Sequence, residues 1–304
     1  MQFKRIKRAI SGVLLLDKAH GISSNTALQQ VKRLFQAEKA GHTGNLDPIA
    51  TGLLPVCFGE ATKFSQYLLD ANKRYSAVFK LGITTTTGDV EGEELSRNPV
   101  AVTQSQLEQA LRGFVGVIQQ IPPMYSALKH QGKALYTYAR AGVEIERKPR
   151  EVEIYSLTLD AFSGDEISVT VSCSKGTYIR VLAEDLGKIL GCGAHMKALR
   201  RTGTGGFDIS QALTLEQLEE MTVERRDASL LPADHLLEGL PKVVLDGDSA
   251  YYARQGQAVW LAKQNVKGMV SMYGPDQTFL GLGEMTDAGK IAPKRLVVAK
   301  EEAA

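Results

Sequence analysis

The sequence is poor in cysteine and has no long apolar run. Its 304 residues include three cysteines, Cys57, Cys173 and Cys192. They are odd in number and far apart, so they fit neither a disulfide framework nor a CxxC zinc site, and we expect reduced thiols in a core. No apolar segment approaches the roughly 20 residues that span a membrane. The basic start lacks the hydrophobic segment and cleavage site of a secretory signal, so we expect a cytoplasmic protein.

Motifs for common cofactors are also missing. The sequence contains no phosphate-binding P-loop, no dinucleotide fingerprint and no cluster of His and Cys at metal-ligand spacing. We therefore expect chemistry that needs no ATP, no redox step, no metal and no other cofactor.

Neither sign of charge dominates overall, since the net charge is +2, but the basic residues are segregated along the chain. Residues 1–80 carry 12 Lys and Arg against 5 Asp and Glu, residues 121–150 carry 6 against 2, and residues 191–206 carry 3 against none. Such segregation allows a nearly neutral protein to present a basic face to phosphates. Blocks of sequence need not coincide with surface patches, so the alternative of solvated charges stays open.

Hydrophobic periodicity predicts a mixed chain dominated by sheet. At 43% hydrophobic residues, the chain can bury a sizeable core and form two domains. Strands are expected at 12–18, 53–58, 74–82, 152–157 and 167–171, and helices at 24–35, 61–69, 104–114, 178–191 and after the capping box at 214–217. A polar loop is expected at 84–93 and a linker at 231–243. Beyond Val243, short strands and glycine turns predict a small β-barrel of about 60 residues.

The stretch GHTGNLDPIATGLLPVCFGEATK places Asp47 directly before Pro48 in a glycine-rich loop. Pro48 fixes its own φ and keeps the backbone of Asp47 out of the helical region. The glycines allow the backbone to approach a flat ligand closely. A lone carboxylate in such a loop is more often a turn former or a helix cap than a catalytic group, so the motif alone leaves both interpretations open.

Three further segments carry candidate binding residues. In CSKGTYIR, Arg180 stands at a helix start, where it could hold a buried carboxylate in its ionised form or could lie on the surface. Tyr75, in NKRYSAVFKLG, could stack on a nucleobase or simply pack in the sheet. Residues 121–150 interleave tyrosines with Lys129 and other cations, a pattern typical of RNA-binding surfaces and also of solvated amphipathic helices.

Together with GAHMKALRR, these stretches resemble, in this order, the bacterial tRNA pseudouridine-55 synthases, which isomerise a uridine in the TΨC loop of tRNA. The frame Gly-x-Leu-Asp-Pro-x-Ala-x-Gly-x-Leu is specific, and the resemblance covers nearly the whole chain. It implies an α+β fold: a catalytic domain, residues 1–240, on a mixed, mainly antiparallel sheet flanked by helices, with residues 121–150 as an RNA-gripping thumb insert. Residues 241–304 would form a PUA-like RNA-binding domain. Asn45 stands where many members have alanine, which bears on loop packing.

The resemblance also implies roles for single residues. Asp47 matches the catalytic aspartate, which assists cleavage of the N1–C1′ bond as a nucleophile or by stabilising the sugar intermediate, before uracil rotates and rejoins through C5. Arg180 matches the arginine paired with that aspartate, and Tyr75 matches a tyrosine that stacks on the base and can take part in proton transfer. The expected substrate contacts are His42, which would enter the loop as the uridine flips out, together with Tyr178, Leu199, Lys63 near the pocket and Lys129 in the insert.

Three other functions are compatible with parts of this pattern. A non-catalytic tRNA-binding or chaperone protein would not need Asp47, Tyr75 and Arg180 together. A hydrolase with Asp47 as nucleophile would need a second carboxylate or a base in comparable context, and we find none. A guide-RNA-dependent pseudouridine synthase shares the aspartate frame but is expected to lack the basic insert. We therefore predict a stand-alone isomerase that acts on tRNA as a monomer, without an obligatory protein partner.

Overall fold

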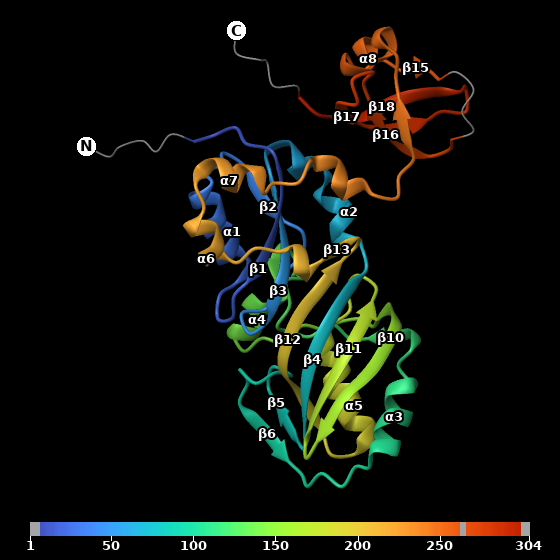
Figure 1. The fold of residues 1–304 in the computed structure, drawn as a ribbon. Coiled ribbons are helices and arrows are strands. Elements are labelled where there is room, and N and C mark those ends of the chain that lie inside the picture. Colours follow the sequence, from blue (N-terminus) through green and yellow to red (C-terminus); the bar gives the residue numbers. More distant parts are fainter. Residues whose placement is uncertain (1–6, 262–265, 299–304) are drawn as a thin grey trace.

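The computed structural model describes residues 7–261 and 266–298 and contains one large sheet and one smaller sheet (Figure 1). The basic segment 1–6, part of the expected basic start, lies outside the described residues. The large sheet has the order β1-β3-β12-β4-β11-β10-β7, with β2 paired to β3 and β13 paired to β12. Neighbours along this order are antiparallel except β12 and β3, which are parallel. The predicted α+β class with a mixed, mainly antiparallel sheet is confirmed.

The strands of the large sheet are β1 (Gly12–Lys18), β2 (Ala40–His42), β3 (Thr51–Phe58), β4 (Lys73–Leu81), β7 (Gly116–Gln120), β10 (Arg150–Ser163), β11 (Glu166–Cys173), β12 (Ala194–Thr204) and β13 (Phe207–Asp208). Two short hairpins are formed by β5 (Ile83–Thr85) with β6 (Glu94–Arg97) and by β8 (Lys129–His130) with β9 (Lys133–Ala134). The helices are α1 (Ser24–Leu34), α2 (Ser65–Leu69), α3 (Gln104–Arg112), α4 (Leu135–Arg140), α5 (Ile179–Leu190), α6 (Leu215–Glu220), α7 (Val223–Ala228) and α8 (Gly247–Arg254), with 3-10 turns η1 (Gly59–Phe64), η2 (Ile209–Gln211) and η3 (Ala233–Leu237).

One face of the large sheet is buried beneath α3 and α5 (Figure 1). Side chains alternate along β4 and β11, so that residues such as Phe79 and Val169 point into the core, whereas their sequence neighbours remain accessible. Leu107 of α3 and Leu182 of α5 pack against them. The three cysteines are buried and free, as expected for core thiols.

Local signals fixed most helix ends. The side chain of Ser23 accepts a hydrogen bond from the backbone N–H of Thr26 and starts α1, Gly191 ends α5 with a φ of 76°, and Thr214 forms a capping box with Gln217 before α6. The helix expected at 61–69 is instead the 3-10 turn η1 followed by the short helix α2, and Phe64 at the end of η1 is buried in a second core.

The predicted linker at 231–243 is a packed segment. Leu236 and Leu237 of η3 are buried against Phe64 and other residues of a second core, and the hydroxyl of Tyr273 donates to the carboxylate of Asp234 at 2.9 Å. Because the second core also includes Leu282, it joins the smaller sheet to the large one.

The smaller sheet is a curled half-barrel with the order β14-β16-β17-β18-β15, formed by β14 (Lys242–Val244), β16 (Met269–Tyr273), β17 (Phe279–Met285), β18 (Lys290–Leu296) and β15 (Val259–Trp260). The short strands expected beyond Val243 are present, and they form this half-barrel where a small barrel was expected. Helix α8 was not predicted, although Asp246 caps it by accepting from the N–H of Ser249, because its apolar residues are too few to give a clear helical period.

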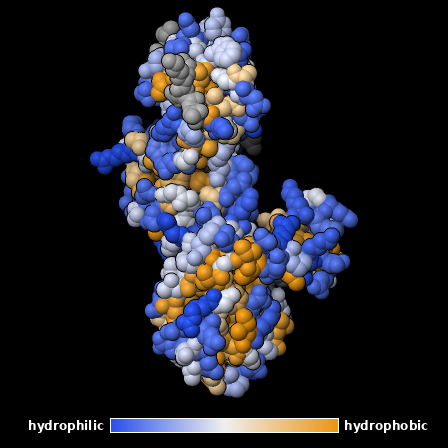
Figure 2. Space-filling model, turned by 90° about the vertical axis from the view of Figure 1, so that its right-hand side faces the viewer, coloured by the Kyte–Doolittle hydropathy of each residue, from blue (hydrophilic) through white to orange (hydrophobic). Residues whose placement is uncertain are grey.

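The surface mixes hydrophilic and hydrophobic side chains, as Figure 2 shows for one face. Val117 on the edge strand β7 and Ile121 just after it are among the exposed large hydrophobic residues. Among the residues that the structure describes, no helix is long and apolar enough to cross a membrane.

Candidate active site

Asp47 lies in the loop between β2 and β3, and this loop is tied down on both sides of the carboxylate. Its neighbours Leu46 and Ile49 are buried, and the hydroxyl of Ser24 in α1 bonds to both the N–H and the C=O of Leu46. The N–H of Ala50 donates to the C=O of Asp47 and closes a turn. The Asp47 side chain is 39% exposed, so a rigid loop presents a carboxylate that a substrate can reach.

Arg180, in the first turn of α5, forms an ion pair with Asp47. Its Nε lies 3.0 Å from Oδ2 of Asp47 and 3.6 Å from Oδ2 of Asp89, and its two terminal nitrogens donate to the backbone C=O of Thr87 and Tyr125 at 3.2 and 2.7 Å. The guanidinium is buried, and each of its three nitrogens has an acceptor. It therefore fixes the direction of Asp47 and links the carboxylate to Tyr125 at the root of the insert.

Asp89 was not singled out by the sequence analysis, which treated TTTTGDVEGE as a polar loop. Its side chain is only 5% exposed, and Oδ1 accepts hydrogen bonds from the hydroxyl of Thr87 and the N–H of Glu91. Two carboxylates therefore share one guanidinium. A buried aspartate beside an arginine from another segment is a contact that only the folded chain reveals.

The charge state of Asp47 depends on opposing effects. Burial raises its pKa, the Arg180 guanidinium opposes this rise, and the Asp89 carboxylate adds to it. Because more than a third of the side chain is open to solvent, water supports the charged form as well. A nucleophile or a stabiliser of positive charge requires the ionised carboxylate, and the Arg180 guanidinium favours that form.

Tyr75 faces the same region from β4, opposite Arg201 in the register with β12. Burial raises the pKa of the Tyr75 hydroxyl, and the neighbouring Arg201 opposes that rise. Tyr75 is therefore neutral at pH 7, with its ring close to a fixed positive charge.

Among the described residues, Arg201 is the largest fully buried side chain, at 1% exposure, and it was not among the predicted site residues. Its Nε donates to the C=O of Leu53 at 2.7 Å, and its terminal nitrogens lie 3.4 and 3.5 Å from the carbonyl oxygens of Asn45 and Gly44. No carboxylate lies within ion-pair distance of it in the described part of the chain. Gly52 is required beside it, since a Cβ there would lie 2.3 Å from the Arg201 carbonyl oxygen.

Lys18, at the end of β1, is a second buried cation near the loop. Its Nζ donates to the carbonyl oxygens of Ala19 and Ile22 at 2.9 and 2.7 Å, and it lies 3.5 Å from that of Pro48. Burial lowers the pKa of Lys18 to about 8, against the opposing attraction of Asp47. The loop of Asp47 thus rests on two side chains, Lys18 and Arg201, that bind its backbone rather than its carboxylate.

The structure places the other predicted substrate contacts on three different elements. His42 ends β2, and burial together with Arg201 lowers its pKa, so that its ring is neutral; its Nδ1 has no hydrogen-bond partner in the described residues. Tyr178 precedes α5, where its N–H donates to Gln120, and burial raises the pKa of its hydroxyl. Leu199 lies on β12, opposite Ala77 in the register with β4.

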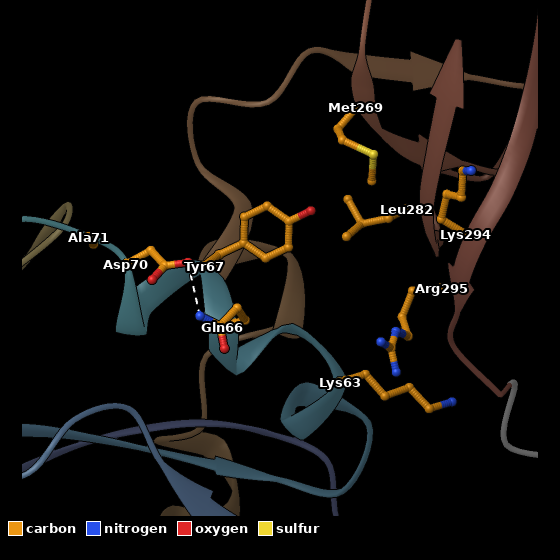
Figure 3. A pocket seen from close by; sticks show the side chains of 9 residues that line it. All are labelled: Lys63, Gln66, Tyr67, Asp70, Ala71, Met269, Leu282, Lys294 and Arg295. Atoms are coloured by element: carbon orange, nitrogen blue, oxygen red, sulfur yellow. Dashed lines mark hydrogen bonds between the residues drawn. The ribbon is translucent and has the colours of Figure 1, made fainter. Parts of the chain in front are cut away.

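Lys63 and Lys129 do not lie on the elements that carry Asp47 and Arg180. Lys63 belongs to η1, beyond the far end of β3, where its Nζ bonds to the carboxylate of Glu60 at 2.6 Å and the C=O of Leu296 at 2.9 Å, in a groove against the smaller sheet (Figure 3). Lys129 is exposed on the β8–β9 hairpin of the insert. The described residues contain no group of three or more His, Cys, Asp or Glu side chains that could hold a metal ion.

We expect Arg201→Lys to lower kcat by between about 10- and 100-fold with little change in KM, because one ammonium cannot reach the carbonyl groups of both β3 and the Asp47 loop, and a carboxylate displaced by an ångström is costly. Steady-state kinetics measure this effect. Arg74→Lys is the matched control, because Arg74 forms an exposed ion pair with Asp208. We expect its kcat to stay within twofold of wild type. Equal kcat in the two variants would show that Arg201 does not position the loop.

Comparison with protein families gives three consecutive matches. A TruB family pseudouridylate synthase (N terminal domain) profile matches residues 32–179, a tRNA pseudouridylate synthase B C-terminal domain profile matches 180–240, and a Pseudouridine synthase II TruB, C-terminal profile matches 241–297. The tRNA pseudouridine synthase B of Methylobacillus flagellatus is 61% identical over 98% of both chains, and that of Stutzerimonas stutzeri is 56% identical over 97% of this chain and 98% of its own.

Solved structures agree with this fold. A Cbf5-Nop10-Gar1 complex contains a chain that is 29% identical, with a TM-score of 0.72 over 95% of this chain and 84% of that one. An H/ACA RNP bound to a substrate RNA containing 2'-deoxyuridine contains one that is 24% identical, with a TM-score of 0.71 over 95% and 86%, which shows the fold alone. The fold and the family profiles together define the class of pseudouridylate synthases, which are isomerases. The chain belongs to the TruB family of these enzymes.

Proposed function

We propose that this protein converts uridine to pseudouridine in the TΨC loop of tRNA, at position 55. The observation that carries the proposal is the partly exposed Asp47 carboxylate, held 3.0 Å from the buried Arg180 guanidinium in a loop stiffened by Pro48. Support for tRNA as the substrate comes from the curated relatives of 53 to 61% identity, each of which is named a tRNA pseudouridine synthase.

The proposed reaction leaves the atomic composition of the nucleotide unchanged, although the C5 hydrogen exchanges with water. The N1–C1′ bond breaks and its electron pair stays on N1, while Asp47 either forms a bond to C1′ or stabilises the sugar intermediate. Uracil then rotates and C5 forms a bond to C1′; where Asp47 is bonded to C1′, that C–O bond breaks and its electron pair returns to the carboxylate. The proton leaves C5 to solvent, and N1 gains a proton. This sequence consumes no oxidant, reductant or co-reactant, and the isomerisation therefore needs only binding, a carboxylate and proton transfer.

Residues around Asp47 supply the other requirements. Arg180 keeps the carboxylate ionised and directed, which lowers the cost of orientation in each turnover. Tyr75 offers a ring on which the uracil can stack and a hydroxyl that can take part in proton transfer. Its neutral hydroxyl beside Arg201 can donate a proton and can also accept one as a hydrogen-bonding oxygen.

The target base must leave its stack to reach Asp47, which costs a few kcal/mol. We propose that His42 fills the space left by the base and that Tyr178 and Leu199 contact the flipped nucleotide. The insert, residues 121–150, would close on the stem-loop, and Tyr125 at its root already bonds to Arg180. Residues 1–240 would then form the catalytic domain and residues 241–304 the PUA-like domain.

A guide-RNA-dependent reaction is the second candidate, because chains from Cbf5 complexes share the fold. We favour action on tRNA alone, by a cytoplasmic monomer without an obligatory protein partner or cofactor, since the basic insert offers its own grip on the stem-loop. A protein that only binds tRNA would not need a partly exposed carboxylate fixed by a buried arginine, so the Asp47–Arg180 pair argues against a non-catalytic function.

Release of tritium from C5 tests the proposal directly. Purified protein is incubated with tRNA that carries tritium at C5 of uridine, without guide RNA, and label released to water is counted. Isomerisation must release the label, whereas binding alone would not. If label is released only when a guide RNA is added, the proposal that the enzyme acts on tRNA without a guide RNA is wrong.

The insert gives a separate prediction about binding. Lys129 and Lys133 lie on its β8–β9 hairpin, and we expect their joint replacement by alanine to weaken tRNA binding and to reduce the slope of log K against log salt by roughly one to two. Filter binding across a salt series measures the slope. Replacement of Lys188 and Lys197, which are ion-paired with Asp185 and Glu166, is the control; an equal change there would contradict a specific role for the insert.

A further inference from the structure

Gln120, the last residue of β7, is a buried glutamine in the large sheet. Side chains alternate along β7, so that Gln120 shares a face with Ile118, which packs against the main core, whereas Gln119 is exposed on the other face. Gln120 is only 2% exposed. Because a primary amide is costly to remove from water unless its C=O and NH2 groups are hydrogen-bonded, the partners of this amide deserve an account.

Both polar atoms of the Gln120 amide bond to the backbone of one residue, Tyr178. Its Oε1 accepts a hydrogen bond from the N–H of Tyr178 at 2.9 Å, and its Nε2 donates to the C=O of Tyr178 at 3.3 Å. Two bonds to the N–H and C=O of one residue repeat the way in which a neighbouring strand holds its partner in an antiparallel ladder. The side chain of Gln120 therefore does for Tyr178 what a paired strand would do.

Tyr178 needs such support because it stands where the chain passes from β11 to α5. Its backbone is still extended, with a φ of −101° and a ψ of 109°, and its side chain makes no capping bond to the helix. The C=O of Tyr178 also accepts from the N–H of Leu182 in α5. Its N–H, however, has no acceptor other than Gln120 in the part of the chain that the structure describes.

Gln120 also lies at the neck of the insert. It is opposite Arg150 in the register of β7 with β10, so the insert, residues 121–150, leaves the sheet and returns to it at neighbouring positions. Within the insert, the C=O of Tyr125 accepts from Arg180. The first turn of α5 is thus tied to the root of the insert at two consecutive points, through Gln120 and through Tyr125.

We infer that Gln120 is a positioning residue for the isomerisation: it fixes the backbone of Tyr178 and thereby sets where the Tyr178 side chain meets the flipped nucleotide. This inference rests on the proposed function, in which Tyr178 contacts that nucleotide. Gln120 itself touches no substrate. Its effect is geometric, since a side chain moves with the backbone that carries it, and a displacement of about 1 Å in a substrate contact can cost about 100-fold in rate.

Gln120→Met is the direct test, because methionine is similar in length and volume but has no amide. We expect kcat for label release from tRNA to fall by between about 10- and 100-fold. KM should stay within about threefold of wild type, because contacts to phosphates, which dominate the affinity for RNA, are untouched.

Gln119→Met is the matched control. It makes the same change one residue earlier, on the exposed face of β7, and its kcat should stay within about twofold of wild type. Thermal unfolding of both variants shows whether each is folded at the temperature of the assay.

A double-mutant cycle with Tyr178→Ala separates positioning from a merely structural role. If Gln120 acts through the Tyr178 side chain, Gln120→Met should change the rate by less than about twofold once that side chain has been removed. Single-turnover rates with enzyme in excess over labelled tRNA measure the four corners of the cycle.

Gln120→Glu keeps the inference testable if Gln120→Met does not fold. The introduced carboxyl still offers an acceptor to the N–H of Tyr178, but it can donate to the C=O of Tyr178 only when it is protonated. Burial should raise its pKa toward the range of the assay, so we expect the ratio of wild-type to variant kcat to fall toward one as the pH is lowered. A ratio that does not change with pH would contradict the inference.

Three further results would overturn the role of Gln120: a folded Gln120→Met with kcat within about twofold of wild type, an equal fall in Gln119→Met, or additive effects in the cycle with Tyr178→Ala. Failure of the proposed function looks different, because the wild-type protein would then release no label from tRNA.

Discussion

Asp47→Asn is expected to lower the rate of label release from tRNA by several orders of magnitude while tRNA affinity changes by less than about tenfold, or about 1.4 kcal/mol. Asparagine keeps the shape and volume of the side chain but removes the negative charge and most of the nucleophilicity. The surroundings of the loop are held by Ser24, Lys18 and Arg201 through its backbone, and these bonds do not depend on the carboxylate.

We expect the affinity for tRNA to be largely retained, because Arg180, the partner of Asp47, keeps other acceptors. After the substitution, Arg180 still has the Asp89 carboxylate and the carbonyl groups of Thr87 and Tyr125 as acceptors, so that a buried cation is not left unpaired. Label release and filter binding on the same preparation separate the two effects. Asp165→Asn, on an exposed ion pair with Lys80, is the control. Turnover of Asp47→Asn within threefold of wild type would make Asp47 a structural turn residue.

Arg180→Lys is expected to have the second largest effect, a fall in kcat of about 100-fold or more. The guanidinium reaches two carboxylates and two backbone carbonyl groups from one plane, and a lysine ammonium cannot serve all four. The lost contacts free Asp47 to move and leave the 5% exposed Asp89 short of a partner. We therefore expect the free energy of unfolding to fall as well, by about 1 to 3 kcal/mol.

Arg97→Lys is the control that shows how much of the effect of Arg180→Lys on kcat and stability comes from the burial of Arg180. Arg97 also makes a two-point contact with a carboxylate, that of Glu94, but it does so on the surface, where such pairs contribute little. Kinetics and thermal unfolding of both variants give the comparison. A change in stability without any change in kcat for Arg180→Lys would assign Arg180 a structural role only.

Much of the fold could be predicted where a signal is local. Strand β1 has the predicted bounds because GVLLLDK is an apolar run between polar neighbours, and α1, α5 and α6 begin or end at their predicted caps. The segment 231–243 connects the two sheets, but its packing could not be predicted, because Leu236 and Leu237 enter a core whose other residues come from distant parts of the chain.

In the candidate site too, features set by adjacent residues could be predicted, whereas contacts between distant segments could not. The Asp-Pro frame marked the loop of Asp47, since both the stiffness and the glycines are properties of adjacent residues. Asp89 lay in a loop that reads as an ordinary polar turn. The resemblance implied that Lys63 lies near the pocket; in the structure, it follows β3 and lines a groove against the smaller sheet.

The sequence by itself determined the local stiffness of the Asp47 loop, the caps, and the alternation that divides the strands into a buried and an accessible face. Only the tertiary structure decided which charges meet. Arg180 contacts Asp47 and Asp89 across separations of 133 and 91 residues, and Arg201 reaches the loop because β12 runs parallel to β3 at Gly52. The physical reason is that burial and pairing of a charge depend on strands that are distant in sequence, whereas backbone stiffness depends on a residue and its immediate neighbours.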